Sequence, residues 1–478
     1  MRDRLPRRTS TMLLGVVVLL LVVAACSSDP AEPPEATTTS LPADTFHVTA
    51  FEDEFPQQFA SYLRNVQVED YVSKLTVDVE PDLPMLWSNY AFSKSYNYPR
   101  GHTFGLVDIL ATPRIGDASI GSCMTCKSTA VPTLLDEFGD DYWSANFNEG
   151  LRPRVLELAA GGEDERLGEL GHVGIGCSDC HDPQTMDLRI TRPSLLNALE
   201  RRGTDIEQAS LNDMRAYVCA QCHVEYYFYP ETRKVTFPWD GGLRPEDLYE
   251  YFQTTAIAAG FEADWIHGVS GAPMLKAQHP EYELWSYGPH GEAGVTCADC
   301  HMPYQRVDGR KVSSHFWGSP LADTAEACRT CHADRTADEL QQRVADIQER
   351  HLSAMEETQS VSVDAHYYVN RLITAGADED VIAECQELVR RGQWYWDIIA
   401  AENSDGFHNP HGAMDAMRVS SDASNLAIRI ATAELVRLGV DLDELREQIE
   451  ATKADVYGED DPLRKNEWVT NDFFPFQG

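Results

Sequence analysis

Five cysteine pairs with the spacing Cys-x-x-Cys lie in the middle of the chain, and a histidine directly follows four of them. The pattern Cys-x-x-Cys-His is typical of covalent haem attachment, in which both thiols bind the porphyrin and the histidine binds the iron from one side. One copy could also be a zinc knuckle, but four copies indicate a multihaem cytochrome c. The residues concerned are Cys177, Cys180 and His181; Cys219, Cys222 and His223; Cys297, Cys300 and His301; and Cys328, Cys331 and His332.

The first pair, Cys123 and Cys126, is followed by Lys127 instead of histidine. One interpretation is a disulfide or a redox-active pair. The interpretation we favour is a fifth haem c whose iron is bound by the lysine amine. An amine binds a metal only when it is neutral, so burial and coordination must lower its pKa. Because electron-transfer haems are closed by two strong ligands, an iron bound differently indicates a reaction centre with one side open to substrate.

Each of the other four irons needs a second histidine if it only transfers electrons. The chain contains 15 histidines, which is enough for four distal ligands, and His102 is an early candidate. The motifs follow one another closely between Cys123 and His332, so the haem groups must pack together and electrons can hop between them. Hydrophobic periodicity is sparse before the first motif, as expected where porphyrin fills much of the core.

The composition restricts the partners. The chain has 478 residues, with 39 basic and 77 acidic side chains and a formal net charge of −38. This balance argues against nucleic acid and against an anionic membrane surface as partners. It also requires that any site for an anionic substrate be locally basic.

Residues 1–25 have the features of a lipoprotein-type signal peptide. Basic residues precede an apolar run from Met12 to Ala25, which is shorter than a membrane-spanning helix, and small residues precede Cys26. Cys26 would then carry a lipid anchor; a plain signal peptide is the alternative. Residues 26–45 are rich in Pro, Thr, Ser and Glu, which predicts a disordered tether. We therefore expect an exported protein on the periplasmic side of the cell membrane.

The remaining chain is expected to form one compact, mainly α domain with few strands. Residues 46–332 would build a haem-packed core, and residues 333–478 would pack on it and form the interface of a homodimer. This last region has the pattern of long amphipathic helices. They are expected over Ala333–Gly376, Asp378–Asn403 and Ser420–Tyr457. Cys385 lies unpaired within the second helix and should be a buried thiol.

The sequence resembles the pentahaem cytochrome c nitrite reductases that form ammonia. One Cys-x-x-Cys-Lys motif followed by four Cys-x-x-Cys-His motifs is part of that resemblance, which covers essentially the whole mature chain. It also rests on three stretches: Cys222-His223-Val224-Glu225-Tyr226-Tyr227, Lys276-Ala277-Gln278-His279-Pro280 and Gly288-Pro289-His290-Gly291.

The resemblance implies a role for each matching residue. Lys127 would bind the iron of the active-site haem, and Arg114, Tyr226 and His279 would surround its open side. One calcium ion would be bound by the side chains of Glu225 and Gln278 and by the backbone carbonyls of Tyr226 and Lys276. The chain between Arg114 and Cys123 looks shorter than in many relatives, which affects the position of Arg114.

The resemblance also assigns the distal histidines. His315 would cap the haem of the second motif, His102 the third, His408 the fourth and His290 the fifth. His411 competes with His408 for the fourth motif, although the context Gly406-Phe407-His408-Asn409-Pro410 favours His408.

The implied reaction is reduction of nitrite to ammonium by six electrons. Arg114, a permanent cation, would hold the anion, and His279 would supply protons near neutral pH. The implied electron donor is a quinol-oxidising multihaem cytochrome of the membrane or a soluble multihaem protein. Two alternatives remain: a pure electron-transfer cytochrome in which Lys127 only tunes a potential, and a related enzyme acting on hydroxylamine, sulfite or tetrathionate.

Overall fold

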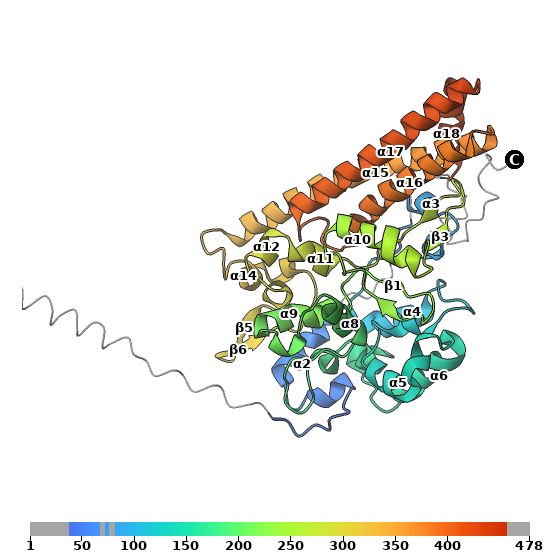
Figure 1. Cartoon of the computed structure of the whole chain (residues 1–478). Coiled ribbons are helices and arrows are strands. Elements are labelled where there is room, and N and C mark those ends of the chain that lie inside the picture. Colours follow the sequence, from blue (N-terminus) through green and yellow to red (C-terminus); the bar gives the residue numbers. More distant parts are fainter. Residues whose placement is uncertain (1–37, 67–71, 76–81, 457–478) are drawn as a thin grey trace, which may run out of the picture.

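The computed structural model describes residues 38–66, 72–75 and 82–456. The expected signal peptide and the first part of the expected tether lie outside these ranges. Long helices form a layer along one side of a body that is built from short helices and loops (Figure 1). Within the described ranges, no helix is long and apolar enough to cross a membrane.

The body that carries the cysteine motifs contains helices of ten residues or fewer. Proline occupies the first position of several of them, where its missing N–H is not needed and its fixed φ suits the helix. These helices are α2 (Pro56–Tyr62), α3 (Leu83–Leu86), α4 (Gly105–Ala111), α5 (Val131–Phe138), α6 (Arg152–Ala159), α7 (Cys177–Cys180), α8 (Pro193–Arg201), α9 (Leu211–Ala220), α10 (Pro245–Tyr251), α11 (Glu281–Ser286), α12 (Pro289–Glu292), α13 (Cys297–His301) and α14 (Thr324–Ala327).

The strands pair into three antiparallel two-stranded ribbons. In the longest ribbon, Val307 pairs with Arg310 across a turn whose residues Asp308 and Gly309 both have positive φ, as a two-residue hairpin turn requires. The prediction of a mainly α fold with few strands is confirmed. The strands are β1 (Tyr227–Phe228), β2 (Val235–Thr236), β3 (Trp265–Ile266), β4 (Pro273–Met274), β5 (Tyr304–Val307) and β6 (Arg310–Ser313).

The long helices begin at side chains that cap their first backbone N–H groups. Thr336 and Glu339 form a capping box at the start of one helix, and Asp378 and Asn409 cap the next two. The helices are α15 (Ala337–Thr374), α16 (Glu379–Ala400), α17 (Pro410–Arg437) and α18 (Leu442–Val456).

The prediction of a third helix over Ser420–Tyr457 is wrong in two ways. The observed helix begins ten residues earlier, at Pro410, because Asn409 caps it and proline suits its first turn. It is also two helices, since Gly439 has a φ of +80° and ends α17 before α18 starts. The other two predicted helices correspond to α15 and α16.

The helix layer and the body share one hydrophobic core. Buried Trp87 and Trp239 of the body belong to the same cluster of apolar side chains as Trp394 of α16. Small side chains such as Ala427 line the buried side of α17 and allow α16 and α17 to lie close together. The Cys385 thiol is fully buried, as predicted, and its Sγ lies 3.7 Å from the carbonyl oxygen of Ala427.

The predicted tether, residues 26–45, includes residues that contact the body. The backbone N–H of Thr39 donates to the carbonyl of Gln184 at 2.9 Å, and Ser40 N–H donates to the Glu54 carboxylate at 3.1 Å. The contacts of the body with the chain therefore begin before Phe46.

A buried arginine joins the first two cysteine motifs. The Arg192 side chain is fully buried and its Nη2 lies 2.6 Å from Oδ1 of Asp179, between the cysteines of the second motif. Its Nε donates to the carbonyl of Thr125 at 2.7 Å and its Nη2 to that of Ser128 at 3.0 Å. These two carbonyls flank Lys127, so Arg192 fixes the first motif against the second.

We predict that Arg192→Met lowers the free energy of unfolding by about 3–5 kcal/mol, because it leaves the Asp179 carboxylate buried without its cation. Guanidinium unfolding followed by haem absorbance would measure the loss. Arg201→Met is the matched control: Arg201 pairs with Asp240 at 2.7 Å, but both side chains are partly exposed, so its loss should cost about 1 kcal/mol or less. Equal losses for both variants would contradict a special role for Arg192.

Candidate functional site

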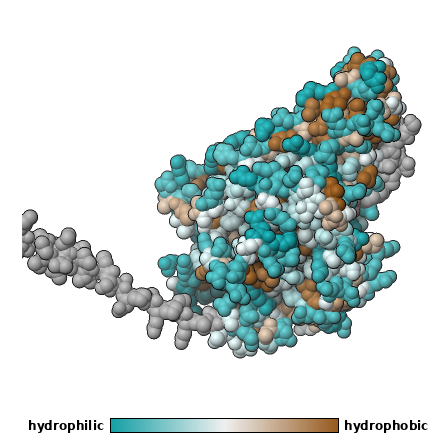
Figure 2. Space-filling view, in the orientation of Figure 1, coloured by the Kyte–Doolittle hydropathy of each residue, from teal (hydrophilic) through white to brown (hydrophobic). Residues whose placement is uncertain are grey.

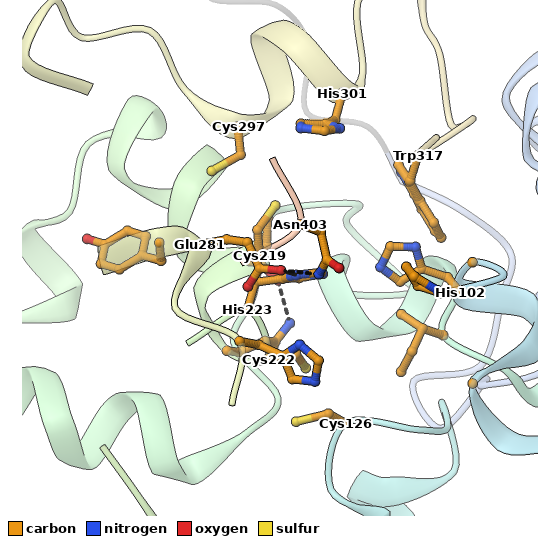
Figure 3. A pocket seen from close by; sticks show the side chains of 18 of the residues that line it. His102, Cys126, Cys219, Cys222, His223, Glu281, Cys297, His301, Trp317 and Asn403 are labelled. Atoms are coloured by element: carbon orange, nitrogen blue, oxygen red, sulfur yellow. Dashed lines mark hydrogen bonds and ion pairs between the residues drawn. The ribbon is translucent and has the colours of Figure 1, made fainter. Parts of the chain in front are cut away.

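One continuous cavity of ≈ 1990 Å³ runs through the body. Its surface includes the cysteines of all five motifs, the histidines of the four Cys-x-x-Cys-His motifs and Lys127. It also includes the predicted site residues His102, Arg114, Tyr226, Gln278, His279, His290, His315 and His408. Figure 3 shows part of it, with cysteines of the first, third and fourth motifs approaching one another. The chain therefore brings together residues that lie far apart in the sequence.

Four pairs of imidazole rings face each other in this cavity. The ring centroids of His181 and His315 are 6.4 Å apart, and those of His102 and His223 are 5.8 Å apart. The centroids of His301 and His408 are also 6.4 Å apart, as are those of His290 and His332. An imidazole nitrogen binds a metal ion at about 2 Å, so two rings on opposite sides of one ion have centroids about 6 Å apart. All four pairs fit a bis-histidine iron.

Each pair joins a motif histidine to the distal histidine that the resemblance implied for it. Of the two candidates for the fourth motif, His408 lines the cavity and faces His301, whereas His411 is exposed and is not part of the cavity surface. The geometry therefore favours His408.

Hydrogen bonds at Nδ1 fix the orientation of several of these rings. His181 Nδ1 lies 2.7 Å from the carbonyl of Met186, and His301 Nδ1 lies 3.2 Å from that of Gly318. His408 Nδ1 instead lies 2.9 Å from the Glu402 carboxylate. A partner that accepts from Nδ1 leaves Nε2 free for the metal. Burial alone would lower the pKa of His408, but the Glu402 carboxylate outweighs it and raises this pKa.

Two glycines allow the chain to pack closely beside His290 and His408. A Cβ at Gly288 would overlap with the carbonyl oxygen of His408, and one at Gly291 would overlap with that of Trp285. Glycine at both positions therefore allows the segment that carries His290 to lie directly against the segment that carries His408. This gives a physical reason for the stretch Gly288-Pro289-His290-Gly291.

The residues predicted around Lys127 lie close enough in the cavity to affect one another's pKa. The pKa of the Tyr226 phenol is influenced by Arg114, Cys123 and Cys126, and the pKa of His279 is influenced by Lys127. The Arg114 guanidinium lies 4.4 Å from the centre of the Phe92 ring. Arg114 thus lies near Tyr226 despite the short segment that precedes Cys123.

The protonation of His279 differs from the expectation. Burial, with smaller contributions from Lys127 and other nearby positive charges, lowers the pKa of His279 to about 3, although Glu281 opposes the shift. The imidazole is therefore neutral near pH 7, so it is an N–H donor and not a stored proton. A bound anion, or a neutral Lys127 amine, would raise this pKa. Burial also raises the pKa of the Tyr226 phenol, which keeps its proton.

The predicted calcium ligands are gathered beside this group. Glu225 is fully buried; its Oε2 accepts the backbone N–H of Gln278 at 2.6 Å, and its Oε1 has no hydrogen-bond partner among the described residues. Burial raises the pKa of this carboxyl well above its usual value. The Nε2 of Gln278 donates to the carbonyl oxygen of Lys276 at 3.1 Å. The unpaired, buried Oε1 of Glu225 is the observation that fits a hard cation here, because such an oxygen normally has a partner.

Within the described residues, no group of three or more acidic, histidine or cysteine side chains is arranged to hold a metal ion. A calcium site at Glu225 would therefore depend on amide and backbone oxygens.

The sequence did not predict the buried ion pair that fixes the segment of the proposed calcium ligands Lys276 and Gln278. Lys276 Nζ lies 2.8 Å from Oδ1 of Asp397, with 1% and 0% of the two side chains exposed. The other oxygen of Asp397 accepts the backbone N–H of Ala277 at 2.9 Å. Asp397 belongs to α16, so the helix layer directly positions the segment that carries Gln278 and His279. Nothing in the local sequence pattern identifies these partners.

Cysteines of different motifs also touch. The side chain of Cys126 contacts that of Cys222, and Cys219 contacts Cys297. The first motif is therefore next to the third, and the third is next to the fourth (Figure 3).

Five attachment motifs and four facing histidine pairs in one cavity define a multihaem c-type cytochrome. The chain belongs to the cytochrome c552 family, whose model matches residues 47–467. This result confirms the resemblance drawn from the motifs.

Curated relatives and a solved structure agree with the family. The cytochrome c nitrite reductase subunit NrfA of Nitratidesulfovibrio vulgaris is 40% identical over 444 residues, which cover 85% of this chain and 82% of that protein. Cytochrome c-552 of Bacteroides thetaiotaomicron is 37% identical over 378 residues, 75% of this chain and 71% of that one. The structure of NrfA from Desulfovibrio desulfuricans, which has two calcium sites, matches with a TM-score of 0.75 at 34% identity and covers 91% of this chain and 98% of that chain.

We predict that Asp397→Asn destabilises the fold by about 3–5 kcal/mol, because the Lys276 ammonium is left buried without its counter-charge. The double variant Lys276→Met with Asp397→Asn should recover most of the loss, since it removes the buried charge and keeps an oxygen that accepts the Ala277 N–H. Asp422→Asn, at an exposed pair with Arg418, is the control and should cost about 1 kcal/mol or less. Denaturant midpoints would measure all three; a double variant as unstable as Asp397→Asn would contradict this explanation.

Proposed function

We propose that this protein reduces nitrite to ammonium at a haem c attached to Cys123 and Cys126 and bound through Lys127. The observation that carries the proposal is the convergence of Arg114, Tyr226 and His279 on the part of the cavity beside this motif. The relationship to NrfA of Nitratidesulfovibrio vulgaris supports the same substrate. A pure electron carrier would have no use for these three donors.

The side chains around Lys127 suit a small anion that must be protonated. Arg114 would hold the nitrite oxygens with a permanent positive charge inside an acidic protein. The protonated Tyr226 phenol and the neutral His279 imidazole would donate hydrogen bonds to the oxygens. Nitrite would raise the pKa of His279, so this residue would take up a proton with the substrate and return it as oxygen leaves as water. When bound, a reduced haem c supplies electrons that weaken the N–O bonds.

Electrons would reach this site through four bis-histidine haems. The proposed axial pairs are His181 with His315, His223 with His102, His301 with His408, and His332 with His290. The contacts between Cys126 and Cys222 and between Cys219 and Cys297 suggest that electrons pass from the fourth motif to the third and from there to the first.

Calcium would support the catalytic residues. The proposed ligands are the side chains of Glu225 and Gln278 and the backbone carbonyls of Tyr226 and Lys276. Because Tyr226 and His279 are next to ligands, one ion would fix both donors and add positive charge beside the anion. The solved NrfA of Desulfovibrio desulfuricans has two calcium sites, which supports calcium in this chain.

The proposal includes the location and the partners. The protein would act on the periplasmic side of the membrane, anchored through Cys26, and receive electrons from a quinol-oxidising multihaem cytochrome or a soluble multihaem donor. It would form a homodimer through its long helices. Figure 2 shows apolar side chains on the surface of the helix layer, and Val436 of α17 and Ile373 of α15 are 57% and 41% exposed.

The main test is the reaction itself. With a reduced dye as donor, the protein should form one ammonium for every six electrons consumed, and nitrite should perturb the spectrum of only one haem. Lys127→Leu should abolish most turnover, because the iron loses its ligand, while Lys127→His should keep the haem and turn over more slowly. Ammonium assay and electron paramagnetic resonance would measure these effects. A Lys127→Leu variant that works at the parent rate would move the reaction centre elsewhere.

A second test concerns calcium. Glu225→Gln, or extraction with a chelator, should reduce nitrite turnover at least tenfold while all five haems stay attached, because Tyr226 and His279 lose their support. Metal analysis, intact mass and the ammonium assay would separate these effects. Glu231→Gln, an exposed carboxylate in the turn after β1, should leave calcium and rate unchanged. If Glu225→Gln keeps both its calcium and its rate, the ion is not bound here.

A further inference from the structure

The axial histidines do not all donate to the same kind of group. Three of them, His181, His301 and His315, have Nδ1 within 2.7–3.2 Å of neutral backbone carbonyls. His408 differs because its Nδ1 lies 2.9 Å from Oε2 of Glu402, a charged carboxylate. This difference affects one haem, that of the fourth motif.

The Glu402 carboxylate is held in this position by several contacts. The residue is 2% exposed and lies in the turn between α16 and α17. Its Oε1 accepts from the Ser404 hydroxyl at 2.7 Å and from the Gly406 N–H at 2.8 Å, so Oε2 remains directed at His408. Gly406 has a φ of +82° and lies against the ring of His351, which fixes the turn.

The physical consequence concerns the electron-donating strength of His408. A carboxylate that accepts the Nδ1 hydrogen makes the imidazole a more basic ligand than a carbonyl does. A more basic ligand stabilises the more positive, oxidised iron and lowers the reduction potential of the haem. We propose that Glu402 acts through His408 to give the haem of the fourth motif a lower potential than the haem of the second motif, whose ligands His181 and His315 both donate to carbonyls.

The same turn has a similar but weaker effect on the haem of the third motif. Asn403 donates to Oε1 of Glu281 at 2.6 Å, and that oxygen lies 3.7 Å from Nδ1 of His223, the ligand from the third motif (Figure 3). A separation of 3.7 Å is too long for a hydrogen bond, so Glu281 acts on His223 through its charge alone. Its effect on the potential is smaller than that of Glu402.

This inference deepens the proposed function and rests on the haem ligation given there. The third and fourth motifs touch at Cys219 and Cys297, and the third touches the first at Cys126 and Cys222. A low potential at the fourth haem makes electron transfer from it toward the Lys127 site favourable. The turn at Glu402 and Asn403 therefore gives the electron path its direction.

The test is a redox titration of the fully loaded protein, followed by visible spectroscopy and electron paramagnetic resonance. Glu402→Gln keeps the size of the side chain and an oxygen acceptor for His408 but removes the charge. The midpoint potential of one bis-histidine haem should rise while the others stay within error, with five haems and the low-spin signals retained. Glu281→Gln should raise a different haem by a smaller amount.

Asp405→Asn is the matched control. Asp405 is in the same turn, and asparagine tolerates its positive φ of 51°. No hydrogen bond from Asp405 to an axial histidine is present among the described residues. If Asp405→Asn shifts the same potential as much as Glu402→Gln, the shift results from removing any negative charge in this turn, and the proposal fails. It fails equally if Glu402→Gln moves no potential.

One further variant and one comparison keep the result interpretable. If Glu402→Gln does not assemble, Glu402→Asp retains the charge at greater distance and should give a smaller upward shift; an unchanged potential in that variant would overturn the proposal. The potentials are measured without nitrite. A protein that shows the shift but forms no ammonium would disprove the proposed reaction and leave the role of Glu402 intact.

Discussion

The separation of the facing imidazoles, which would lie on opposite sides of one iron, is the constraint on which the rest of the structure depends. Bond lengths to a metal are nearly fixed, so each histidine pair must keep its centroids about 6 Å apart. Three of the four pairs join distant segments, such as His181 with His315. The body has short helices and long connections, which cannot hold such distances by regular packing alone. Buried ion pairs and glycine contacts supply the precision instead, as at Arg192 and Gly288.

The sequence predicted the attachment residues because thiol spacing is a local property. Cys-x-x-Cys-His places all three groups within five residues, and no tertiary information is needed. The distal histidines are different, since no fixed spacing identifies them and only the turn-like context Gly406-Phe407-His408-Asn409-Pro410 favoured His408 over His411. Their assignment came from the resemblance, and the facing rings favour the same choice.

Other features could not be predicted for physical reasons. The start of α17 was missed because Asn409 and Pro410 read locally as a turn, although they also cap a helix. The contacts of Asp397 with Lys276 and of Glu402 with His408 depend on where α16 ends in space. Charged residues in a helix pattern are normally assigned to its solvated side. The pKa of His279 depends on burial, which only the fold determines.

The acidic composition and the proposed anion site are compatible because Arg114 lines the cavity without an ion pair to a carboxylate among the described residues. The net charge is −38, yet Arg192, Lys276 and Arg390 are buried at 0–2% exposure. Lys276 and Arg192 are each neutralised by one carboxylate, whereas Arg114 reaches the cavity with an aromatic neighbour. Arg114 can therefore offer its charge to a ligand.

That aromatic neighbour links two parts of the site. The Phe92 ring lies 4.4 Å from the Arg114 guanidinium carbon and 5.2 Å from Lys276 Nζ. Arg114, the proposed substrate-binding cation, and Lys276, a proposed calcium ligand, thus share one aromatic neighbour. Residues with a common partner do not contribute independently, so exchanges at positions 92, 114 and 276 would be tolerated only in compatible combinations. Sequence variation among family members should then show these three positions changing together.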